Sequence, residues 1–266
     1  MTATTSHINV KSVALPAEHG GWSFVLEPIL LGLLLSPSAV GLLLAVAVFA
    51  AFLVRQPLKV MLVDWRRGRR YARTKLAERF VLLYGGIALA GLVVVAASAG
   101  YIVFFPLALA LPLVLIQLAF DVTSRSRDWL PEVAGPTALA SVASSIALAG
   151  GWSPEAALPL WAIVAARAVP TVLYVRARLR LEKGVAIISA PILVAHAAAL
   201  IAVIGLAAAG LAPWLAAIAL VILLLRAAYG LSSYRKPVPA RIIGFQELAF
   251  GVTTVLLVSV GYALGL

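Results

Sequence analysis

The chain has no cysteine, only three histidines and few charged residues. Charged residues make up 12% of its 266 positions, whereas soluble domains carry about 25%. Without cysteine there is no disulfide framework, thiol nucleophile, thiolate metal site or iron–sulfur cluster. His7, His19 and His196 alone leave little for a histidine metal cage. We therefore expect neither a metal nor a cofactor.

Apolar residues are what the chain has in excess. They make up 63% of the sequence, against roughly 45–50% in soluble domains, and the mean hydropathy is +1.07. The excess covers the whole length, which excludes both a soluble enzyme with a single anchor and a disordered chain. The composition predicts an all-α, polytopic membrane protein.

Nine apolar stretches are long enough to be membrane spans, since a helix needs about 20 residues to cross a core near 30 Å. We expect residues 20–266 to form one transmembrane domain after a cytoplasmic tail, residues 1–19. The predicted spans are 20–36, 38–54, 80–98, 101–120, 134–150, 156–175, 185–208, 211–229 and 242–264.

The basic residues indicate how these spans are oriented. Of the 21 Lys and Arg, 19 lie in the N-terminal tail or in alternate connections, and only Arg167 and Arg226 lie within spans. By the positive-inside rule, the N-terminus and the basic connections are cytoplasmic, and an odd number of spans places the C-terminus outside. Attraction of these connections to anionic lipid headgroups explains the net charge of +11, so we expect no nucleic-acid partner.

Titratable residues cluster where the first span begins. Glu18 and His19 precede Gly20-Gly21-Trp22, and Glu27 follows inside the span. A carboxylate at that depth costs roughly 2.5–3.5 kcal/mol unless it is paired or hydrated. Glu18, His19 and Glu27 are our candidate catalytic residues. In the alternative interpretation, the segment is an interfacial anchor with Trp22 at headgroup level.

Charged residues inside other spans offer a structural alternative for Glu27. Arg167, Arg226 and Glu247 all interrupt apolar stretches. Glu27 and Glu247 are plausible ion-pair partners of Arg226 and Arg167, so the carboxylates have either a catalytic or a purely structural role.

Two basic connections are candidate binding sites for an anionic head group. Arginine supplies forked donors for phosphate or carboxylate, and a neighbouring aspartate can fix one guanidinium. The alternative is that these residues only orient the protein in the bilayer. The candidate substrate-binding residues are Arg66, Arg67, Arg69, Arg70, Arg73, Asp64, Arg178 and Arg180.

Two resemblances follow from these motifs. The A-E-H-G-G-W start, the next Glu-Pro and the segment K-x-x-x-x-D-x-R-R-G-R-R-Y-x-R-T-x-L-A-E-R resemble the YwiC-like family of bacterial membrane proteins. The layout of nine spans with functional loops after the second and sixth also resembles the UbiA-type intramembrane prenyltransferases. That second resemblance implies a helical bundle around a cavity that opens laterally to lipid.

The sequence departs from the prenyltransferase pattern at the aspartate-rich motifs that hold magnesium in those enzymes. If Asp64 takes the last position of the first motif, the earlier positions fall on Gln56, Pro57 and Val60. The second loop offers only Glu182 among basic residues. Direct binding of an anionic head by arginine could replace the metal, and so could loss of catalysis.

Together these features predict a YwiC-like, multi-pass protein of the bacterial inner membrane. We expect it to bind, and in one interpretation to modify, an anionic amphiphile or isoprenoid-type lipid in a cavity open to the cytoplasm. Whether it is an enzyme stays open, as a UbiA-like transferase without the magnesium motifs. Two alternatives are a transporter or export permease, and a scaffold or assembly factor without catalysis. The expected partners are membrane lipids and an anionic or isoprenoid small molecule.

Overall fold

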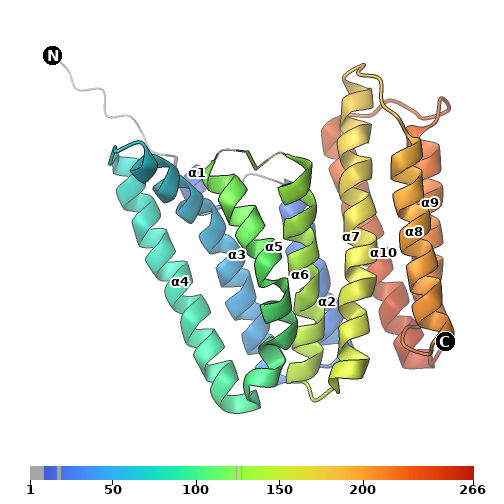
Figure 1. The fold of residues 1–266 in the computed structure, drawn as a ribbon, viewed down its shortest axis with the longest axis horizontal. Helices are drawn as coiled ribbons and strands as arrows, with labels where there is room; N and C mark the ends of the chain where they lie inside the picture. Colours follow the sequence, from blue (N-terminus) through green and yellow to red (C-terminus); the bar gives the residue numbers. More distant parts are fainter. Residues whose placement is uncertain (1–8, 17–18, 124, 127) are drawn as a thin grey trace.

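The computed structural model describes residues 9–16, 19–123, 125–126 and 128–266, and this part of the chain contains helices but no strand. The described part contains nine longer helices, and these lie roughly side by side as a bundle (Figure 1). A short helix, α1, precedes them. The elements are α1 (Val10–Ala14), α2 (His19–Leu35), α3 (Ala39–Arg66), α4 (Ala72–Ala99), the 3-10 turn η1 (Tyr101–Phe104), α5 (Phe105–Val122), α6 (Trp129–Ala149), α7 (Pro154–Glu182), α8 (Ala190–Ala208), α9 (Trp214–Leu231) and α10 (Ala240–Leu264).

The helices confirm the prediction of an all-α, polytopic membrane protein. Eight of them, α3 to α10, are long and apolar enough to cross a membrane, α5 being counted with η1. The ninth, α2, is apolar but has 17 residues, which span about 25 Å at 1.5 Å per residue. Each predicted span corresponds to one of these nine helices.

The largest difference from the predicted spans is in the basic segment 55–79. We expected a polar connection there, but α3 continues to Arg66 and α4 already begins at Ala72. Met61 of α3 and Ala77 of α4 pack with Val13 of α1 in a small apolar cluster. The helices extend because this part of their contact face is still apolar. Gly68, with φ of 63°, allows the tight turn between them.

Helix α6 lies at the centre of the bundle and packs against α2, α3, α5 and α7. Nearly all of its second half is buried. The hydroxyl of Ser144 donates to the carbonyl of Ala157 at 2.7 Å and accepts from the amide of Trp161 at 3.0 Å. These bonds fix α6 against α7, so α7 carries its own charged residues at a defined height in the bundle.

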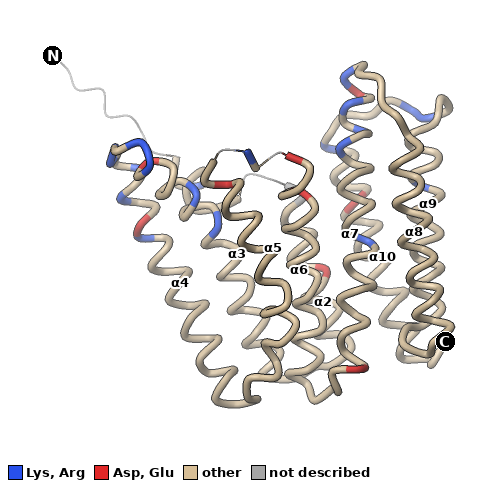
Figure 2. The backbone as a smooth tube through the Cα atoms, viewed as in Figure 1, with Lys and Arg blue, Asp and Glu red and all other residues tan. Residues whose placement is uncertain are grey.

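The two ends of the bundle differ in charge. Lys and Arg gather at the end where α3 joins α4, α5 joins α6, α7 joins α8 and α9 joins α10 (Figure 2). We refer to this as the basic end. The opposite end holds the short turns at Ser36 to Ser38, Gly100 and Gly150 to Ser153. The distribution of basic residues that the sequence predicted is therefore present in the described structure.

Candidate functional site

A cavity of about 1580 Å³ lies between α2, α3, α5, α6, α7 and α10, with one residue contributed by α4. Pockets for small molecules usually measure about 300–1,000 Å³. The cavity therefore has room for a molecule with a long chain. It extends from the basic end, where Arg55 and Arg241 line it, to Leu107 in the first turn of α5 near the opposite end.

The cavity has two walls of different character. We call the α3, α4 and α5 side the apolar wall, because most of its residues are apolar: Ala47, Val48, Ala51, Phe52, Leu58, Leu92, Leu107, Ala110, Val114 and Leu118. We call the facing α6, α7 and α10 side the polar wall, because it carries the charged and hydroxyl groups Glu132, Arg167, Thr171, Arg176, Arg241 and Glu247.

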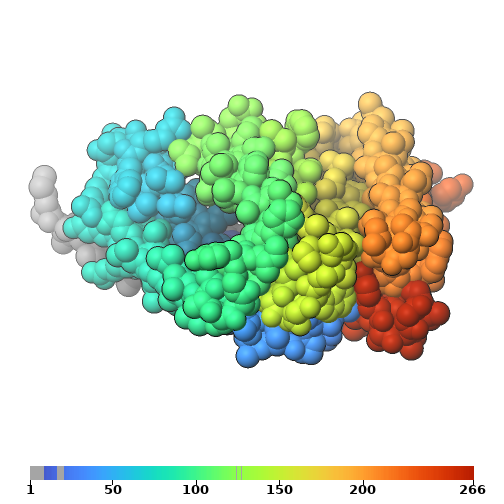
Figure 3. Space-filling model, turned by 60° about the horizontal axis from the view of Figure 1, so that its bottom comes forward, coloured from blue at the N-terminus to red at the C-terminus, as the bar shows by residue number. Residues whose placement is uncertain are grey.

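The apolar wall borders a hollow on the surface. Figure 3 shows this hollow between the blue and cyan segments of α3 and α4 and the green segment of α5. Ala47, Leu92 and Val114 line the cavity from these three helices. The cavity is thus reached from the side of the bundle as well as from the basic end.

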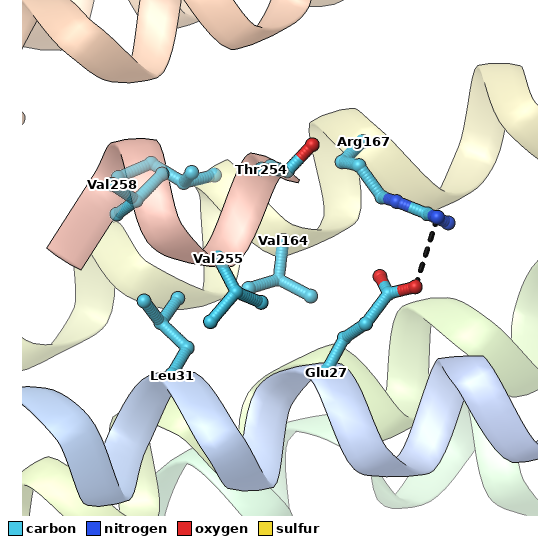
Figure 4. Close-up of a pocket in the computed structure, with 8 residues that line it drawn as sticks. Glu27, Leu31, Val164, Arg167, Thr254, Val255 and Val258 are labelled. Carbon is cyan, nitrogen blue, oxygen red and sulfur yellow. Dashed lines mark ion pairs between the residues drawn. The ribbon is translucent and has the colours of Figure 1, made fainter. Parts of the chain in front are cut away.

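Two ion pairs are buried among the helices. Arg167 Nη2 of α7 lies 2.9 Å from Glu27 Oε1 of α2, and the two side chains are 1% and 8% exposed (Figure 4). Arg226 Nη1 of α9 lies 3.0 Å from Glu247 Oε1 of α10. We call these four residues the buried charge cluster. The predicted pairing of Glu27 and Glu247 with the two arginines is confirmed.

The cluster is connected further by hydrogen bonds and ring contacts. Arg167 Nη2 also donates to the backbone carbonyl of Glu247 at 3.1 Å. Arg226 Nη2 donates to Thr171 Oγ1 at 3.2 Å, and its guanidinium stacks 4.0 Å from the ring centroid of Tyr174. Because Thr171 accepts this bond, its own hydroxyl hydrogen remains available to a group in the cavity.

Both arginines of the cluster have donors without a hydrogen-bond partner among the described residues, but only Arg167 is among the residues that line the large cavity. Neither its Nε nor its Nη1 has a hydrogen-bond partner among the described residues. Buried polar groups in proteins are nearly always satisfied, so each exception needs an explanation. Two donors on a guanidinium that is 1% exposed are suited to an oxyanion.

The space between Arg167 and Glu27 is small. A void of only about 10 Å³ lies there, between α2, α7 and α10, and Figure 4 shows Leu31, Val164, Val255 and Val258 around it. This volume is about that of one water-sized probe. A ligand larger than a water molecule therefore has room at Arg167 only on the side of the large cavity.

Gly251 on α10 makes room for the Glu27–Arg167 pair, and sequence analysis did not identify it. A Cβ atom at this position would lie 2.0 Å from Glu27 Oε1 and 2.9 Å from Arg167 Nη2. Only glycine lets α10 approach the pair this closely. The single-sequence signal for this role is weak, because the same helix contains Gly244 with open space around it.

A second polar cluster joins α3 to α5 at the basic end of the cavity. Arg55 Nε lies 2.7 Å from Asp121 Oδ2, and Arg55 Nη2 donates to Oδ1 at 3.1 Å. Gln117 Nε2 donates to the same Oδ1 at 3.3 Å, and Lys59 Nζ lies 3.7 Å from it. We call this the α3–α5 clasp. It holds the two helices together at the basic end, where the apolar wall begins.

Most of the predicted substrate-binding residues at the α3–α4 turn are engaged with neighbouring groups, Arg69 with the hydroxyl of Tyr71 among them. Asp64 is fully buried and receives hydrogen bonds from Arg73 and Thr74, and Arg66 donates to the carbonyl of Val122. Arg70 pairs with Glu78, and this hydrogen bond raises the pKa of Arg70 above its ordinary value. These residues lie in the last turns of α3, in the α3–α4 turn and in the first turn of α4, and none of the residues from 64 to 73 is among those lining the cavity.

The second predicted basic connection lies on the other flank of the bundle. The α7–α8 connection is distant from the α3–α4 turn along the long axis of Figure 1. Arg178 is buried and donates to the carbonyls of Gly230 and Lys236, which fixes α7 to the α9–α10 connection. Arg180, two residues further along α7, is exposed. A substrate-binding role for either connection stays a prediction.

Glu18 and the side chain of His19 lie outside the described residues, so the structure places only Glu27 of the three candidate catalytic residues. Magnesium does not fit the two carboxylates suggested by the prenyltransferase resemblance. Asp64 is bound by Arg73 and Thr74, and Glu182 by Arg178 and the amide of Val238. Within the described ranges, no three His, Asp or Glu residues are grouped so that they could hold a metal ion.

The fold and the site define a multi-pass α-helical membrane protein with a lateral cavity and a buried charge cluster beside it. The model of the YwiC-like protein family matches residues 15–149, just over half of the chain, and the chain belongs to this family. The match covers α2 to α6, whereas Arg167, Arg226 and Glu247 lie beyond it. No curated protein and no solved structure matches the chain.

Proposed function

We propose that this YwiC-like protein binds an anionic amphiphile, such as an isoprenoid-type or other long-chain lipid, in the large cavity. The observation that carries the proposal is the contrast between the apolar wall, which borders a hollow on the side of the bundle, and the polar wall. Contact with the apolar wall stabilises an apolar chain, and the polar wall offers hydrogen-bond donors to a charged head group.

The size and access of the cavity support a lipid-like ligand over a small polar one. A polar metabolite would leave most of the apolar wall in contact with water, which is unfavourable at roughly 25 cal/mol per Å². A lipid that enters through the hollow between α3, α4 and α5 keeps its chain in an apolar environment throughout. The UbiA-like arrangement, with a cavity open laterally to lipid, stays part of the proposal.

Trp22 offers a direct test, because it lines the cavity. Bromine atoms quench tryptophan fluorescence on contact. The purified protein in mild detergent is titrated with a brominated long-chain alkyl sulfonate and, separately, with the brominated alcohol of the same chain length. We expect saturable quenching by both probes and tighter binding of the sulfonate. Linear, non-saturable quenching by both would contradict the proposal.

Two matched pairs of variants locate the quenching. Trp22→Phe should remove the saturable part of the quenching. Trp214→Phe should keep it, because Trp214 is the first residue of α9, at the end of the bundle opposite the basic end, and does not line the cavity. Ala51→Phe fills the apolar wall and should weaken binding, whereas Ala90→Phe on the exposed face of α4 should not. Mass spectrometry of lipids that copurify with wild type but not with Ala51→Phe then identifies the natural ligand class.

Transport is the second candidate function. It is favoured by the buried pair that joins α2 to α7, because transporters often place charged groups near the membrane midplane at the interface of moving parts. Against it, the described helices α2, α3, α5, α6 and α7 continue unbroken through their internal prolines, whereas transporter sites typically use discontinuous helices. Accumulation of the sulfonate inside proteoliposomes, rather than binding alone, would support transport.

For the orientation, we propose that the basic end faces the cytoplasm of a bacterial inner membrane, as the positive-inside rule predicts. Reporter domains fused after Lys183 and after Arg235 should then behave as cytoplasmic, and one fused after Leu266 as external. If neither probe binds but the orientation is as proposed, the results favour a scaffold that binds no ligand.

A further inference from the structure

We infer that Arg167 is the anion-binding residue of the cavity, and that Glu27 takes up a proton when the anion binds. The inference rests on the proposed function, since it assigns the head group of the amphiphile to a particular side chain. It predicts proton-linked binding of an oxyanion, a carboxylate, sulfonate or phosphate ester, at a depth well inside the membrane.

The position of Arg167 supports the first part. It lies thirteen residues from the start of α7, or roughly 20 Å along the helix axis, between the large cavity and the small void around Glu27. Its Nη2 is used by Glu27 and by the carbonyl of Glu247. Its Nε and Nη1 have no hydrogen-bond partner among the described residues. Thr171, one turn further along α7, adds a hydroxyl that also lines the cavity.

The surroundings of this donor pair suit an anion with an apolar chain. The ring of Phe24 lies 5.7 Å from the Arg167 guanidinium and lines the same cavity. From there the apolar wall continues to Leu107 near the opposite end of the bundle. An oxyanion at Arg167 thus leaves the attached chain in contact with α3, α4 and α5.

The charge balance of the buried cluster supports the second part. Two arginines and two glutamates give a net charge of zero when all are ionised. A bound monoanion adds one negative charge in an environment of low dielectric constant, where an unbalanced charge is costly. Uptake of one proton by a carboxylate restores the balance.

Glu27 is the carboxylate that loses most electrostatic stabilisation when the anion binds. Arg167 is its cation, and the anion would share that cation, whereas Glu247 keeps Arg226 at 3.0 Å. Of the helices packed against α2, α7 contributes Arg167 and α10 contributes Glu247. The charged residues of α3 and α6, Arg55 and Glu132 among them, lie in the halves of those helices nearer the basic end. These groups make Glu27 the site of proton uptake.

The binding test uses the brominated sulfonate, because its charge does not change with pH, and the neutral alcohol as reference. Wild type should bind the sulfonate more tightly as the pH falls from about 8 to about 5, while its affinity for the alcohol stays constant. A pH indicator in weak buffer should show the uptake of about one proton per bound sulfonate. Equal pH dependence for both probes would overturn the inference.

Two variants separate the roles of the residues. Glu27→Gln keeps the shape of the side chain and leaves Arg167 without a competing charge, so the sulfonate should bind more tightly at neutral pH and without pH dependence. The double variant Glu27→Gln with Arg167→Gln keeps the cluster neutral, and should weaken sulfonate binding by about tenfold or more while binding the alcohol like wild type. Thermal unfolding of each variant shows that it is folded.

The outcomes distinguish this inference from the proposed function. If neither probe binds wild type saturably, the proposed function fails. If both bind, but the double variant retains full sulfonate affinity, the cavity binds amphiphiles and Arg167 is not the anion site. If Glu27→Gln retains the pH dependence of wild type, another group takes up the proton and the second part of the inference is wrong.

Discussion

The buried charge cluster and the ion pairs of the basic end use the same residue types in opposite settings. Arg167 is 1% exposed and Glu27 is 8% exposed, whereas Arg70 and its partner Glu78 are 63% and 20% exposed. If an exposed pair is broken, water solvates both charges. If the buried pair is broken, a charge remains in an apolar bundle without compensation. Similar contact distances therefore imply different energies, and burial decides which pairs the fold depends on.

The largest effect should come from changing Arg167 alone to Gln. Glu27 would then be buried without a cation, and the carbonyl of Glu247 would lose its donor. Breaking a buried ion pair from one side typically costs about 3–5 kcal/mol. We expect a loss of that size in the equilibrium unfolding of the protein in mixed detergent micelles.

The matched control is the double variant with Glu27→Gln added. Because it leaves no unbalanced charge, it should recover most of the lost stability. A double variant as unstable as Arg167→Gln would mean that the arginine stabilises the bundle by packing, for example against Phe24, and not through its pair.

The next largest effect is expected for Gly251→Ala. The added Cβ would lie 2.0 Å from Glu27 Oε1, so the ion pair or α10 has to move. Overpacking of this kind costs about 1–3 kcal/mol. On the same helix, Gly244→Ala meets nothing within 4 Å and should be neutral or slightly stabilising through helix propensity. Equal effects of the two changes would argue against a close approach at Gly251.

The sequence predicted which helices exist, because each apolar stretch has the length that a bilayer requires. It did not predict where they end. Apolarity marks the bilayer and not the helix, and α3 continues as a helix through Arg55, Lys59 and Asp64 to Arg66. The extension is stabilised by packing on α1 and α4, and such contacts between helices are not encoded in hydropathy.

The candidate site, too, could be predicted only in part from the sequence. The cost of a charge in a membrane made Glu27, Arg167, Arg226 and Glu247 visible in the sequence one by one. Their pairing was left as alternatives, because it depends on how each helix is rotated about its axis. Gly251 and the cavity itself result from the packing of several helices and have no local signature. Only the structure brings them together.

A smaller effect is expected at the α3–α5 clasp, whose burial is intermediate between that of the buried charge cluster and that of the exposed pairs. Asp121 is 1% exposed but its partner Arg55 is 25% exposed. Asp121→Asn keeps the size and removes the charge that accepts hydrogen bonds from Arg55 and forms an ion pair with Lys59, and should cost about 1–2 kcal/mol. Asp128→Asn, whose pair with Arg125 is far more exposed, is the control of the same type and should change stability less. A larger loss of stability for Asp128→Asn than for Asp121→Asn would contradict the relation between the burial of an ion pair and its contribution to stability.

The smallest effect is expected for Arg70→Gln, at the exposed end of the comparison. The Arg70–Glu78 pair is short, but both side chains reach water, and Glu78 lies in the second turn of α4, whose other contacts remain. Solvation of the separated charges should offset the lost attraction, so the unfolding midpoint should not change measurably, and added salt should not change that result. The same holds for Glu78→Gln. A clear destabilisation by either change would show that the α3–α4 turn is held by its ion pairs. The basic residues there would then have a structural role in addition to orienting the protein, and contact geometry, not burial, would set the energy of the pair.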